Sequence, residues 1–231
     1  MFDLSLMGRL SFAHRAPDPA KTPLPPGRQH LGLFPERDAV LYVPSTLPKS
    51  GPVKLMVMFH GAGGFPEKVA PFLQEHAERE GFLLLLPHSM FVTWDIVIGG
   101  NGPDLERLDQ ELAEVASRYL LDPAHLCFAG FSDGASYALS TGLTNGSLVT
   151  HIIAFSGGFM SVMLPDGEPR VFIAHGLVDE QCPIDTSGRK HAKQLQANNY
   201  PLKYVEFNGP HAIQPPIVAM AVDFFLGRGE V

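Results

Sequence analysis

The sequence predicts an α/β fold in which helices cover both faces of a mainly parallel sheet. Short, almost wholly apolar runs recur along the chain, which is typical of strands that are buried on both faces. Segments with helical periodicity alternate with these runs, as expected for parallel strands with helical connections. Apolar residues make up 45% of the 231 residues and charged residues only 18%, so residues 1–231 are expected to form one domain around a large core.

Residues 1–36 are predicted to contain an N-terminal strand and a proline-rich loop. Five prolines fall within residues 16–30. Because proline fixes φ and lacks an N–H group, this stretch is expected to be neither helix nor central strand. It is predicted to run over the surface as an extended loop that joins two edge strands.

Strands and helices are expected to alternate from residue 38 onward. The predicted strands are the apolar runs over residues 38–44, 53–59, 82–86, 125–129, 151–155, 171–174 and 203–207. The predicted helices cover residues 66–80, 103–121, 132–144, 187–198 and 216–225. The clearest helix is 103–121, where apolar residues recur every three or four positions: Leu105, Leu108, Leu112, Val115 and Tyr119.

The composition argues against several classes of protein. A formal net charge of −7, without clusters of lysine and arginine, argues against nucleic acid as a partner. Cys127 and Cys182 are too few for a disulfide framework or a thiolate zinc site. No window reaches about 18 uncharged apolar residues, and the first residues lack a basic segment followed by an apolar one. We therefore expect no membrane span and a cytoplasmic location.

A nucleophile-elbow pattern follows the strand predicted at residues 125–129. It reads Gly130-Phe131-Ser132-Asp133-Gly134, which matches G-x-S-x-G, and a predicted helix comes directly after it. In such a turn the serine is strained and its hydroxyl projects above the sheet, while the glycines leave room for neighbouring backbone. Ser132 is therefore the predicted nucleophile. Ser156 lacks a glycine two residues upstream and is interpreted as part of a strand-end turn.

A loop of small residues, His60-Gly61-Ala62-Gly63-Gly64, follows the strand predicted at residues 53–59. Small residues let backbone N–H groups approach a substrate carbonyl oxygen. The N–H of Ala62 is the predicted first half of an oxyanion hole, with Gly61 and Gly63 as alternatives, and the N–H of Asp133 is the second half. A nucleotide phosphate loop is the competing interpretation, but no lysine follows in the required position.

Candidate partners for Ser132 follow the last two predicted strands. His175-Gly176-Leu177-Val178-Asp179 supplies a carboxylate, and Asn208-Gly209-Pro210-His211 supplies an imidazole. A serine nucleophile needs a histidine to take its proton and a carboxylate to orient that histidine. The chain order Ser132, Asp179, His211 is the order that an elbow of this kind requires. Asp185 and, more remotely, Asp166 are the alternative acids.

Two further histidines begin catalytic loops. We expect His60 and His175 to hold these loops through hydrogen bonds to backbone rather than to contact substrate. A zinc site made of His60, His175 and His211 lacks an H-E-x-x-H pattern or any comparable pair. No metal is therefore predicted.

These four loops resemble those of α/β-hydrolases of the carboxylesterase/phospholipase group, to which the acyl-protein thioesterase-like enzymes belong. The resemblance covers roughly residues 37–227 and extends, more weakly, to polyhydroxybutyrate depolymerase-type esterases and dienelactone hydrolases. It implies the α/β-hydrolase fold, a Ser-Asp-His triad and no cofactor. Asp133 stands where thioesterase-like members commonly carry glutamine, and Ala135 where they often carry glycine. Ser132 differs from the cysteine nucleophile of the dienelactone hydrolases.

The expected site is open. Hydrolases of this fold often insert a lid after the strand that follows the nucleophile helix, but here only residues 157–170 are available, so no cap domain is predicted. A longer excursion over residues 88–102 carries Phe91 and Trp94. Together with Phe131 they are the predicted substrate-binding residues, and the alternative for Trp94 is a place in the core.

The predicted function is hydrolysis of carboxylic esters with short or medium acyl chains through an acyl-enzyme on Ser132, with thioesters as an open alternative. The expected partner is a small-molecule ester, and a homodimer is left open. A non-catalytic ligand-binding protein on the same fold is one competing hypothesis, although all three triad residues are present. A peptidase of the same fold is the other, although such enzymes usually carry an additional domain.

Overall fold

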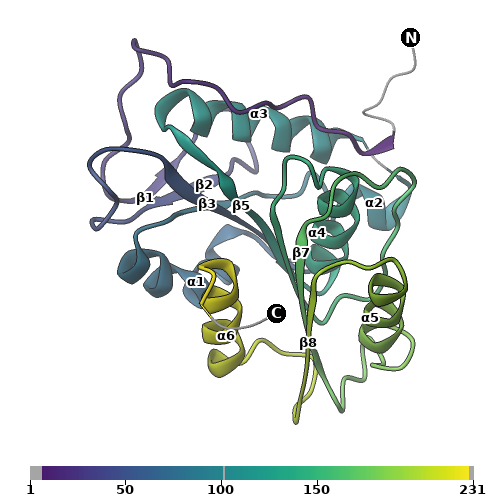
Figure 1. Cartoon of the computed structure of the whole chain (residues 1–231). Coiled ribbons are helices and arrows are strands. Elements are labelled where there is room, and N and C mark those ends of the chain that lie inside the picture. The colour runs from purple at the N-terminus through teal and green to yellow at the C-terminus, as the bar shows by residue number, and fades with distance from the viewer. Residues whose placement is uncertain (1–6, 101, 229–231) are drawn as a thin grey trace.

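The computed structural model describes residues 7–100 and 102–228, in which eight strands form one sheet (Figure 1). The strands are β1 (Gly27–His30), β2 (Val40–Val43), β3 (Val53–Phe59), β4 (Leu83–Leu86), β5 (Leu121–Phe131), β6 (His151–Phe155), β7 (Arg170–Gly176) and β8 (Leu202–Phe207). The helices are α1 (Pro66–Glu80), α2 (Asp95–Ile98), α3 (Pro103–Arg118), α4 (Asp133–Thr144), α5 (Gly188–Ala197) and α6 (Pro215–Phe225).

The strand order is β1-β2-β4-β3-β5-β6-β7-β8. The pairs β1·β2 and β2·β4 are antiparallel, and every other pair is parallel. This confirms the predicted mainly parallel sheet, and β3, α1 and β6 begin and end where the sequence predicted. Strand β5 begins earlier than predicted because Leu121 pairs with Val53 at the start of β3.

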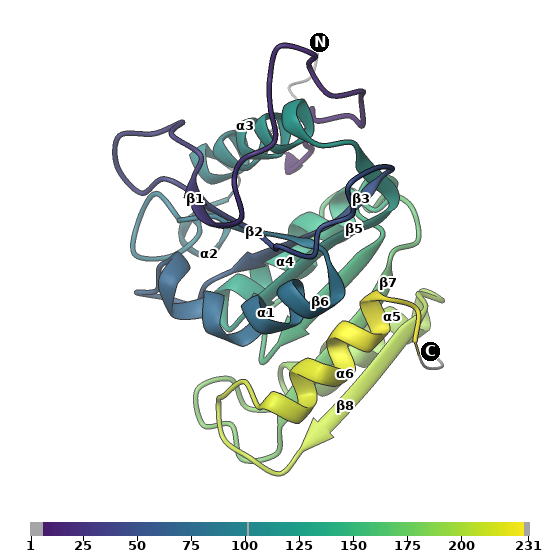
Figure 2. The ribbon, with the colours of Figure 1, turned by 90° about the vertical axis from the view of Figure 1, so that its left-hand side faces the viewer.

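Each face of the sheet has its own apolar core. Leu55, Val57 and Phe59 of β3 pack in the core that includes residues of α3 and α4, whereas Met56 and Met58 pack in the core that includes residues of α1 and α6. Helices α1 and α6 lie side by side on that second face (Figure 2). Because both faces are covered, β3 has no polar face, which explains its continuous apolar sequence.

The N-terminal segment differs from the prediction. Gly27–His30 forms β1, so the predicted loop over residues 16–30 is wrong for its last four residues. Pro26 is the last proline of the stretch, and the residues after it are free to pair with β2, as Arg28 does opposite Tyr42. No strand precedes β1 within residues 7–26, so the loop does not join two edge strands. Residues 1–6, where the predicted N-terminal strand would begin, lie outside the described residues.

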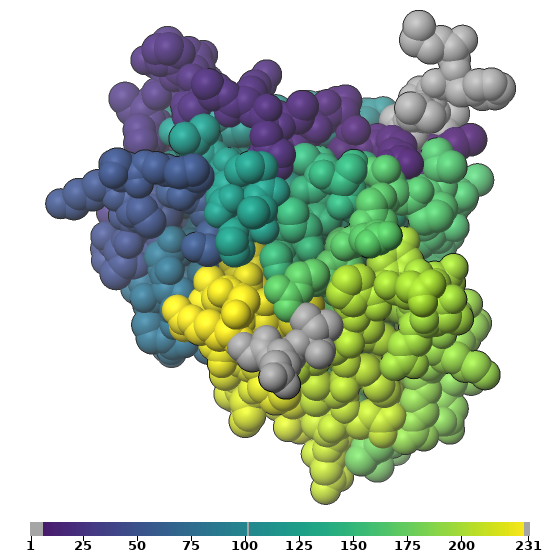
Figure 3. Space-filling view, in the orientation of Figure 1, coloured from purple at the N-terminus to yellow at the C-terminus, as the bar shows by residue number. Residues whose placement is uncertain are grey.

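The proline-rich segment instead lies along α3. The Asp18 N–H donates to the Ser117 carbonyl at 2.8 Å, and the Leu24 N–H donates to the Tyr119 hydroxyl at 2.9 Å. In the space-filling view this segment forms a rim along one end of the molecule (Figure 3). It is thus part of the packing around the sheet.

Two connections at the carboxyl ends of the strands bear on the site. Residues 156–169, between β6 and β7, contain neither helix nor strand, which agrees with the predicted lack of a cap at this point. The excursion after β4 contains the short helix α2, which the sequence did not predict. Among the described helices, none combines the length and the apolar character that crossing a membrane requires.

Candidate active site

Ser132 lies in a strained turn between β5 and α4. Its backbone has φ 56° and ψ −121°, a conformation that non-glycine residues seldom adopt, and its N–H donates to the Phe155 carbonyl at 2.9 Å. A Cβ on Gly130 would overlap the Gly134 carbonyl, and a Cβ on Gly134 would overlap the Phe59 carbonyl. Both glycines of the G-x-S-x-G pattern are therefore required by the close approach of backbone around the elbow.

Asp179 and His211 meet beside this turn. The Nδ1 atom of His211 lies 2.7 Å from Oδ2 of Asp179, whose side chain is fully buried. The other oxygen, Oδ1, accepts the N–H groups of Gln181 at 3.0 Å and Cys182 at 2.8 Å. Burial opposes ionisation of this carboxyl, but the Cys182 N–H and His211 outweigh it and hold the pKa of Asp179 below its usual value. An ionised Asp179 keeps the proton of His211 on Nδ1.

The second ring nitrogen of His211 is left without a partner. Its Nε2 atom is buried and forms no hydrogen bond to any described residue. The ring of Phe131, the neighbour of Ser132, packs against the imidazole with the ring centroids 4.8 Å apart. The arrangement therefore places a basic nitrogen next to the elbow, ready to accept a proton.

His175 also contacts the Asp179 carboxylate. It is fully buried, and its Nε2 atom lies 2.7 Å from the Cys182 carbonyl and 3.3 Å from Oδ2 of Asp179. Because a carbonyl can only accept, Nε2 of His175 carries the proton. The side chain thus holds the loop after β7, which is the role predicted for it.

The two alternative acids lie in other surroundings. Asp185 has a side chain that is 77% exposed and forms an ion pair with Arg189. Asp166 forms an ion pair with Arg9 and accepts hydrogen bonds from Ser147. Neither carboxylate contacts His211 within the described part of the chain, so Asp179 is the acid that the structure brings to the histidine.

The loop after β3 passes close to the serine. A Cβ on Gly61 would lie 3.2 Å from the Cβ of Ser132. Gly63 donates its N–H to the Val92 carbonyl at 2.7 Å, which removes it as an oxyanion donor. The N–H of Ala62 forms no hydrogen bond within residues 7–100 and 102–228. Ala62, with Gly61 beside it, therefore stays available to bind an oxyanion.

Asp133 begins helix α4, so its N–H has no carbonyl partner one turn earlier. This N–H, at the positive end of the helix, is free to stabilise negative charge. The carboxylate of Asp133 accepts a hydrogen bond from the Thr93 hydroxyl, at 2.7 Å to Oδ2. Sequence reasoning missed Thr93 because the residue lies in a segment without a recognisable motif.

His60 fastens the oxyanion loop to the segment after β4. The Ser89 N–H donates to Nε2 of His60 at 3.1 Å, so Nε2 has no proton, and Nδ1–H donates to the Gly61 carbonyl at 2.8 Å. Burial lowers the pKa of His60 to about 4, which keeps the ring neutral near pH 7. The side chain binds backbone on both sides, as the sequence predicted.

Trp94 is a core residue, so its predicted place in a substrate-binding wall is wrong. Only 1% of it is exposed, and it stacks on Tyr137 with the ring centroids 4.8 Å apart. Its indole N–H donates to the His60 carbonyl at 2.8 Å. A buried tryptophan needs a partner for that N–H, and here the partner is the backbone that leads into the oxyanion loop.

Asp104, in the first turn of α3, anchors the same segment. Its carboxylate accepts the N–H groups of Met90 at 2.7 Å and Asp95 at 2.8 Å. Burial raises the pKa of Asp104 to about 6, against the effect of these hydrogen bonds, and the nearby Asp95 carboxylate raises it further. Sequence reasoning missed this contact, because a carboxylate in the first turn of a helix is common for its favourable interaction with the helix dipole alone.

A cavity of about 290 Å³ opens beside Gly61. Its remaining walls come from the oxyanion loop, one side of α1 and the elbow: His60, Ala62, Gly64, Lys68, Val69, Phe72 and Phe131. Of the three predicted substrate-binding residues, only Phe131 lines it. Phe91 is 49% exposed and does not line this cavity, so its role in substrate binding stays a prediction. The signal that identifies Phe72 in hindsight is an aromatic residue on the exposed side of an amphipathic helix.

The sheet, the elbow and the later strand ends that carry Asp179 and His211 define the α/β-hydrolase fold. Solved structures of other proteins have the same fold. The chain is similar to esterase PE8, at 22% identity and a TM-score of 0.65 over 81% of this chain and 98% of that chain. A phospholipase/carboxylesterase from Dyadobacter fermentans is 23% identical, with a TM-score of 0.64 over 81% and 95%.

Esterase 2 of Thermogutta terrifontis, in a structure phosphorylated by paraoxon, is also similar to this chain. It is 17% identical, with a TM-score of 0.64 over 87% of this chain and 94% of that chain. At such identities the likeness shows the fold. The sequence itself matches no protein-family profile and no curated relative.

Proposed function

We propose that this protein is a serine hydrolase that cleaves carboxylic esters, including thioesters, with short or medium acyl chains. The observation that carries the proposal is the Asp179–His211 pair, whose free Nε2 atom stands next to the strained serine elbow. The similar solved structures support it, since several are esterases or carboxylesterases. Ser132 is the nucleophile, His211 the general base and Asp179 the residue that orients it.

The reaction runs in two halves. His211 Nε2 takes the proton of Ser132 as the serine oxygen attacks the ester carbonyl, and the carbonyl oxygen becomes an oxyanion. The N–H groups of Ala62 and Asp133 stabilise this charge, with Gly61 as the alternative to Ala62. When the tetrahedral intermediate collapses, the alcohol or thiol leaves with the proton from His211. Water then attacks the acyl-enzyme in the same way, which releases the acid and restores the serine.

The two catalytic donors are supported by one segment. Residues 89–94 bind the His60 ring and carbonyl, the Gly63 N–H and, through Thr93, the Asp133 side chain. Removal of one oxyanion donor in comparable sites costs about 3–4 kcal/mol of the activation barrier. A displacement of this segment is thus expected to slow the reaction although none of its residues touches the reacting atoms.

The acyl chain is assigned to the cavity beside Gly61 because its walls include Val69, Phe72 and Phe131. A volume of about 290 Å³ suits a short or medium chain better than a long one. A second cavity of about 340 Å³ adjoins His211, and it is lined in part by Val178 and Pro210. This position beside the general acid suits the leaving alcohol or thiol.

The test is turnover of p-nitrophenyl esters from acetyl to palmitoyl, together with a matching thioester series. Ser132→Ala is expected to lower kcat by at least about 10⁴-fold. Ser156→Ala is the matched control, because Ser156 is also a strand-end serine with a positive φ of 55°, but its hydroxyl is fully buried and out of reach of a substrate. Its rate is expected to equal that of the parent.

A fluorophosphonate probe supplies the second readout. It is expected to label Ser132 in the parent and to leave Ser132→Ala unlabelled. Full activity of Ser132→Ala, labelling of another residue, or parent rates no higher than the uncatalysed reaction would each show the proposal to be wrong.

A further inference from the structure

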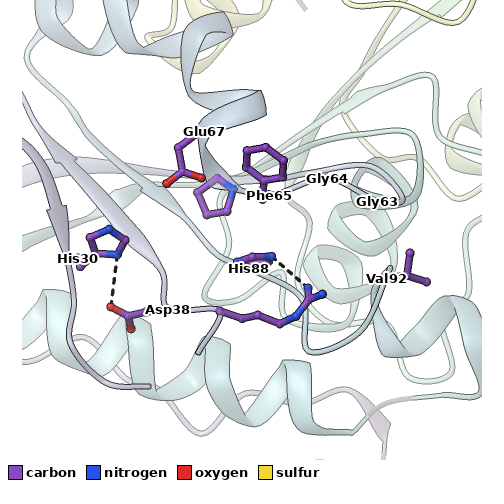
Figure 4. A pocket seen from close by; sticks show the side chains of 10 residues that line it. His30, Asp38, Gly63, Gly64, Phe65, Glu67, His88 and Val92 are labelled. Carbon is purple, nitrogen blue, oxygen red and sulfur yellow. Dashed lines mark hydrogen bonds and ion pairs between the residues drawn. The ribbon is translucent and has the colours of Figure 1, made fainter. Parts of the chain in front are cut away.

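A cavity of about 450 Å³ that the proposed reaction does not use lies against Gly63 and Gly64 (Figure 4). Its other walls come from the end of β1, the segment before β2, the start of α1 and the segment after β4. Gly64 also lines the acyl cavity, so the two cavities meet at the oxyanion loop. Charged and titratable side chains concentrate in this cavity rather than in the acyl cavity.

Arg37 lines the cavity and has an unusual backbone conformation. Its φ of 53° is one that non-glycine residues seldom adopt, and such strain is found at ligand-binding positions more often than elsewhere. A single nitrogen, Nη1, donates to the carbonyls of Ser89 and Phe91, each at 2.9 Å. Within the described residues, Nε and Nη2 form no hydrogen bond. These two atoms make up the edge of the guanidinium group that binds a planar carboxylate with two parallel hydrogen bonds.

His88 adds a second donor. Nη1 of Arg37 lies 3.1 Å from Nε2 of His88 and shares its two protons among this nitrogen and the carbonyls of Ser89 and Phe91. Since a guanidinium group only donates, Nε2 presents its lone pair to Nη1. The proton of the neutral ring is therefore on Nδ1, which has no partner among the described residues. Burial and then the charge of Arg37 lower the pKa of His88, which keeps the ring in this neutral form. In Figure 4 the His88 ring lies between Asp38 on one side and Phe65 and Glu67 on the other.

The two acidic residues of the cavity differ in their bonding. Oδ2 of Asp38 accepts the Gly32 N–H at 2.7 Å, and Oδ1 accepts the N–H groups of Leu33 and Phe34 at 3.2 and 3.3 Å. Backbone N–H groups thus occupy both of its oxygen atoms, and Nδ1 of His30 lies 3.8 Å from Oδ2. Glu67 is exposed and has no such partners within the described residues. The lining thus holds one guanidinium group and two carboxylates, and this charge opposes a phosphate dianion more strongly than a singly charged carboxylate.

We propose that this cavity binds a carboxylate, held by the Nε–Nη2 edge of Arg37 and by the Nδ1–H of His88. The apolar remainder of such a ligand would lie against Phe65 and Val92. The carboxylate comes either from a free carboxylic acid or from an acid group on the ester substrate, since the cavity adjoins the oxyanion loop. The site itself does not depend on the proposed esterase activity.

The probe pair is benzoate and benzamide, which share their shape and differ in charge. Calorimetry on the full chain carrying Ser132→Ala is expected to show that benzoate binds about tenfold more tightly than benzamide. Arg37→Gln is expected to remove that difference. Equal affinity for the two probes, no binding of either, or unchanged selectivity in Arg37→Gln would overturn the proposal.

Arg37 also binds the carbonyls of residues 89 and 91, so Arg37→Gln could fail to fold. A second variant tests the site independently of Arg37. Glu67→Gln removes the open carboxylate and is expected to strengthen benzoate binding severalfold at low salt. Glu75→Gln, on the exposed side of the same helix, is the matched control and is expected to leave it unchanged. Equal effects of the two substitutions, or none from Glu67→Gln, would contradict the site.

Turnover of two esters by Arg37→Gln distinguishes the two possible sources of the carboxylate. If the acid group belongs to the substrate, Arg37→Gln lowers kcat/KM more for an ester that carries a free carboxylate than for the same ester with a carboxamide in its place. If the ligand is a free acid, Arg37→Gln changes kcat/KM for both esters alike, while the preference of the Ser132→Ala protein for benzoate over benzamide is still lost. Because the binding measurement needs no turnover, an inactive parent enzyme would refute the esterase proposal alone.

Discussion

Oδ2 of Asp179 lies 2.7 Å from Nδ1 of His211, although the two residues are 32 positions apart and follow different strands. The carboxylate reaches the histidine already bound by two backbone N–H groups, those of Gln181 and Cys182. It is therefore held in one orientation before any substrate arrives. This geometry makes the electrostatic role of Asp179 separable from its role in packing.

Asp179→Asn tests that role. The amide keeps the shape but can donate to Nδ1, which would put the imidazole proton on Nε2 and block the base. We expect kcat to fall about 10⁴-fold with little change in KM. Asp185→Asn is the control, because the Asp185 carboxylate is 77% exposed and forms an ion pair with Arg189 rather than a contact with His211. This variant is expected to keep the parent rate. Comparable losses in both variants would contradict the assignment.

His60 predicts a specific pH dependence of stability. Its pKa falls from 6.5 in the unfolded chain to about 4 in the folded protein, so as pH drops below 6.5 the unfolded chain takes up the proton first. The contribution of this group to the free energy of unfolding is complete above pH 6.5. It decreases by about 3 kcal/mol as the pH falls from 6.5 to 4.

Urea unfolding of the parent and of His60→Gln between pH 7.5 and pH 4 measures this contribution. Gln offers an acceptor to the Ser89 N–H but does not titrate in this range. The difference in stability between the two proteins is expected to shrink as pH falls, because other groups cancel in the comparison. A constant difference over the range would show that His60 does not titrate as described.

Gly134→Ala is expected to destabilise the protein by about 1–3 kcal/mol or to prevent folding, since its Cβ would overlap the Phe59 carbonyl. Gly99→Ala is the matched control, because a Cβ there meets nothing within 4 Å. Thermal unfolding of both variants measures the effect. Equal melting temperatures would show that the elbow has room that the structure does not indicate.

Phe72 is expected to set acyl-chain preference. Phe72→Ala removes one wall of the cavity beside Gly61, so kcat/KM for the best medium-chain ester should fall about tenfold while the acetyl ester changes little. Phe91→Ala should leave the chain-length profile unchanged, because Phe91 does not line that cavity. Rates over the ester series measure both profiles. An unchanged profile in Phe72→Ala would place the acyl chain elsewhere.

Local patterns were enough to predict most strands, most helices and the elbow. The run from Val53 to Phe59 indicates a buried strand because every residue but one is fully apolar, and the structure buries both faces of β3. The glycines around Ser132 are informative for the same reason: each is required by backbone only a few ångströms away. Such features depend on neighbours in sequence or on burial alone, so a single chain reveals them.

Contacts between segments distant in sequence could not be predicted. Trp94 was compatible with a binding wall or a core position, and its stacking on Tyr137 decided for the core. The segment 89–94 has no motif, yet it binds both halves of the proposed oxyanion hole. The helical pattern places Phe72 on the exposed side of α1, and only the structure shows that Phe72 and the loop after β3 line one cavity.

The sequence by itself determined the alternation of strands and helices, the candidate nucleophile and its candidate partners, because hydrophobic period and steric demand act over a few residues. Only the tertiary structure decided which acid pairs with His211, which N–H groups stay free and which side chains face a cavity. These are distances between loops that different strands carry, and the packing of the sheet and its helices sets them.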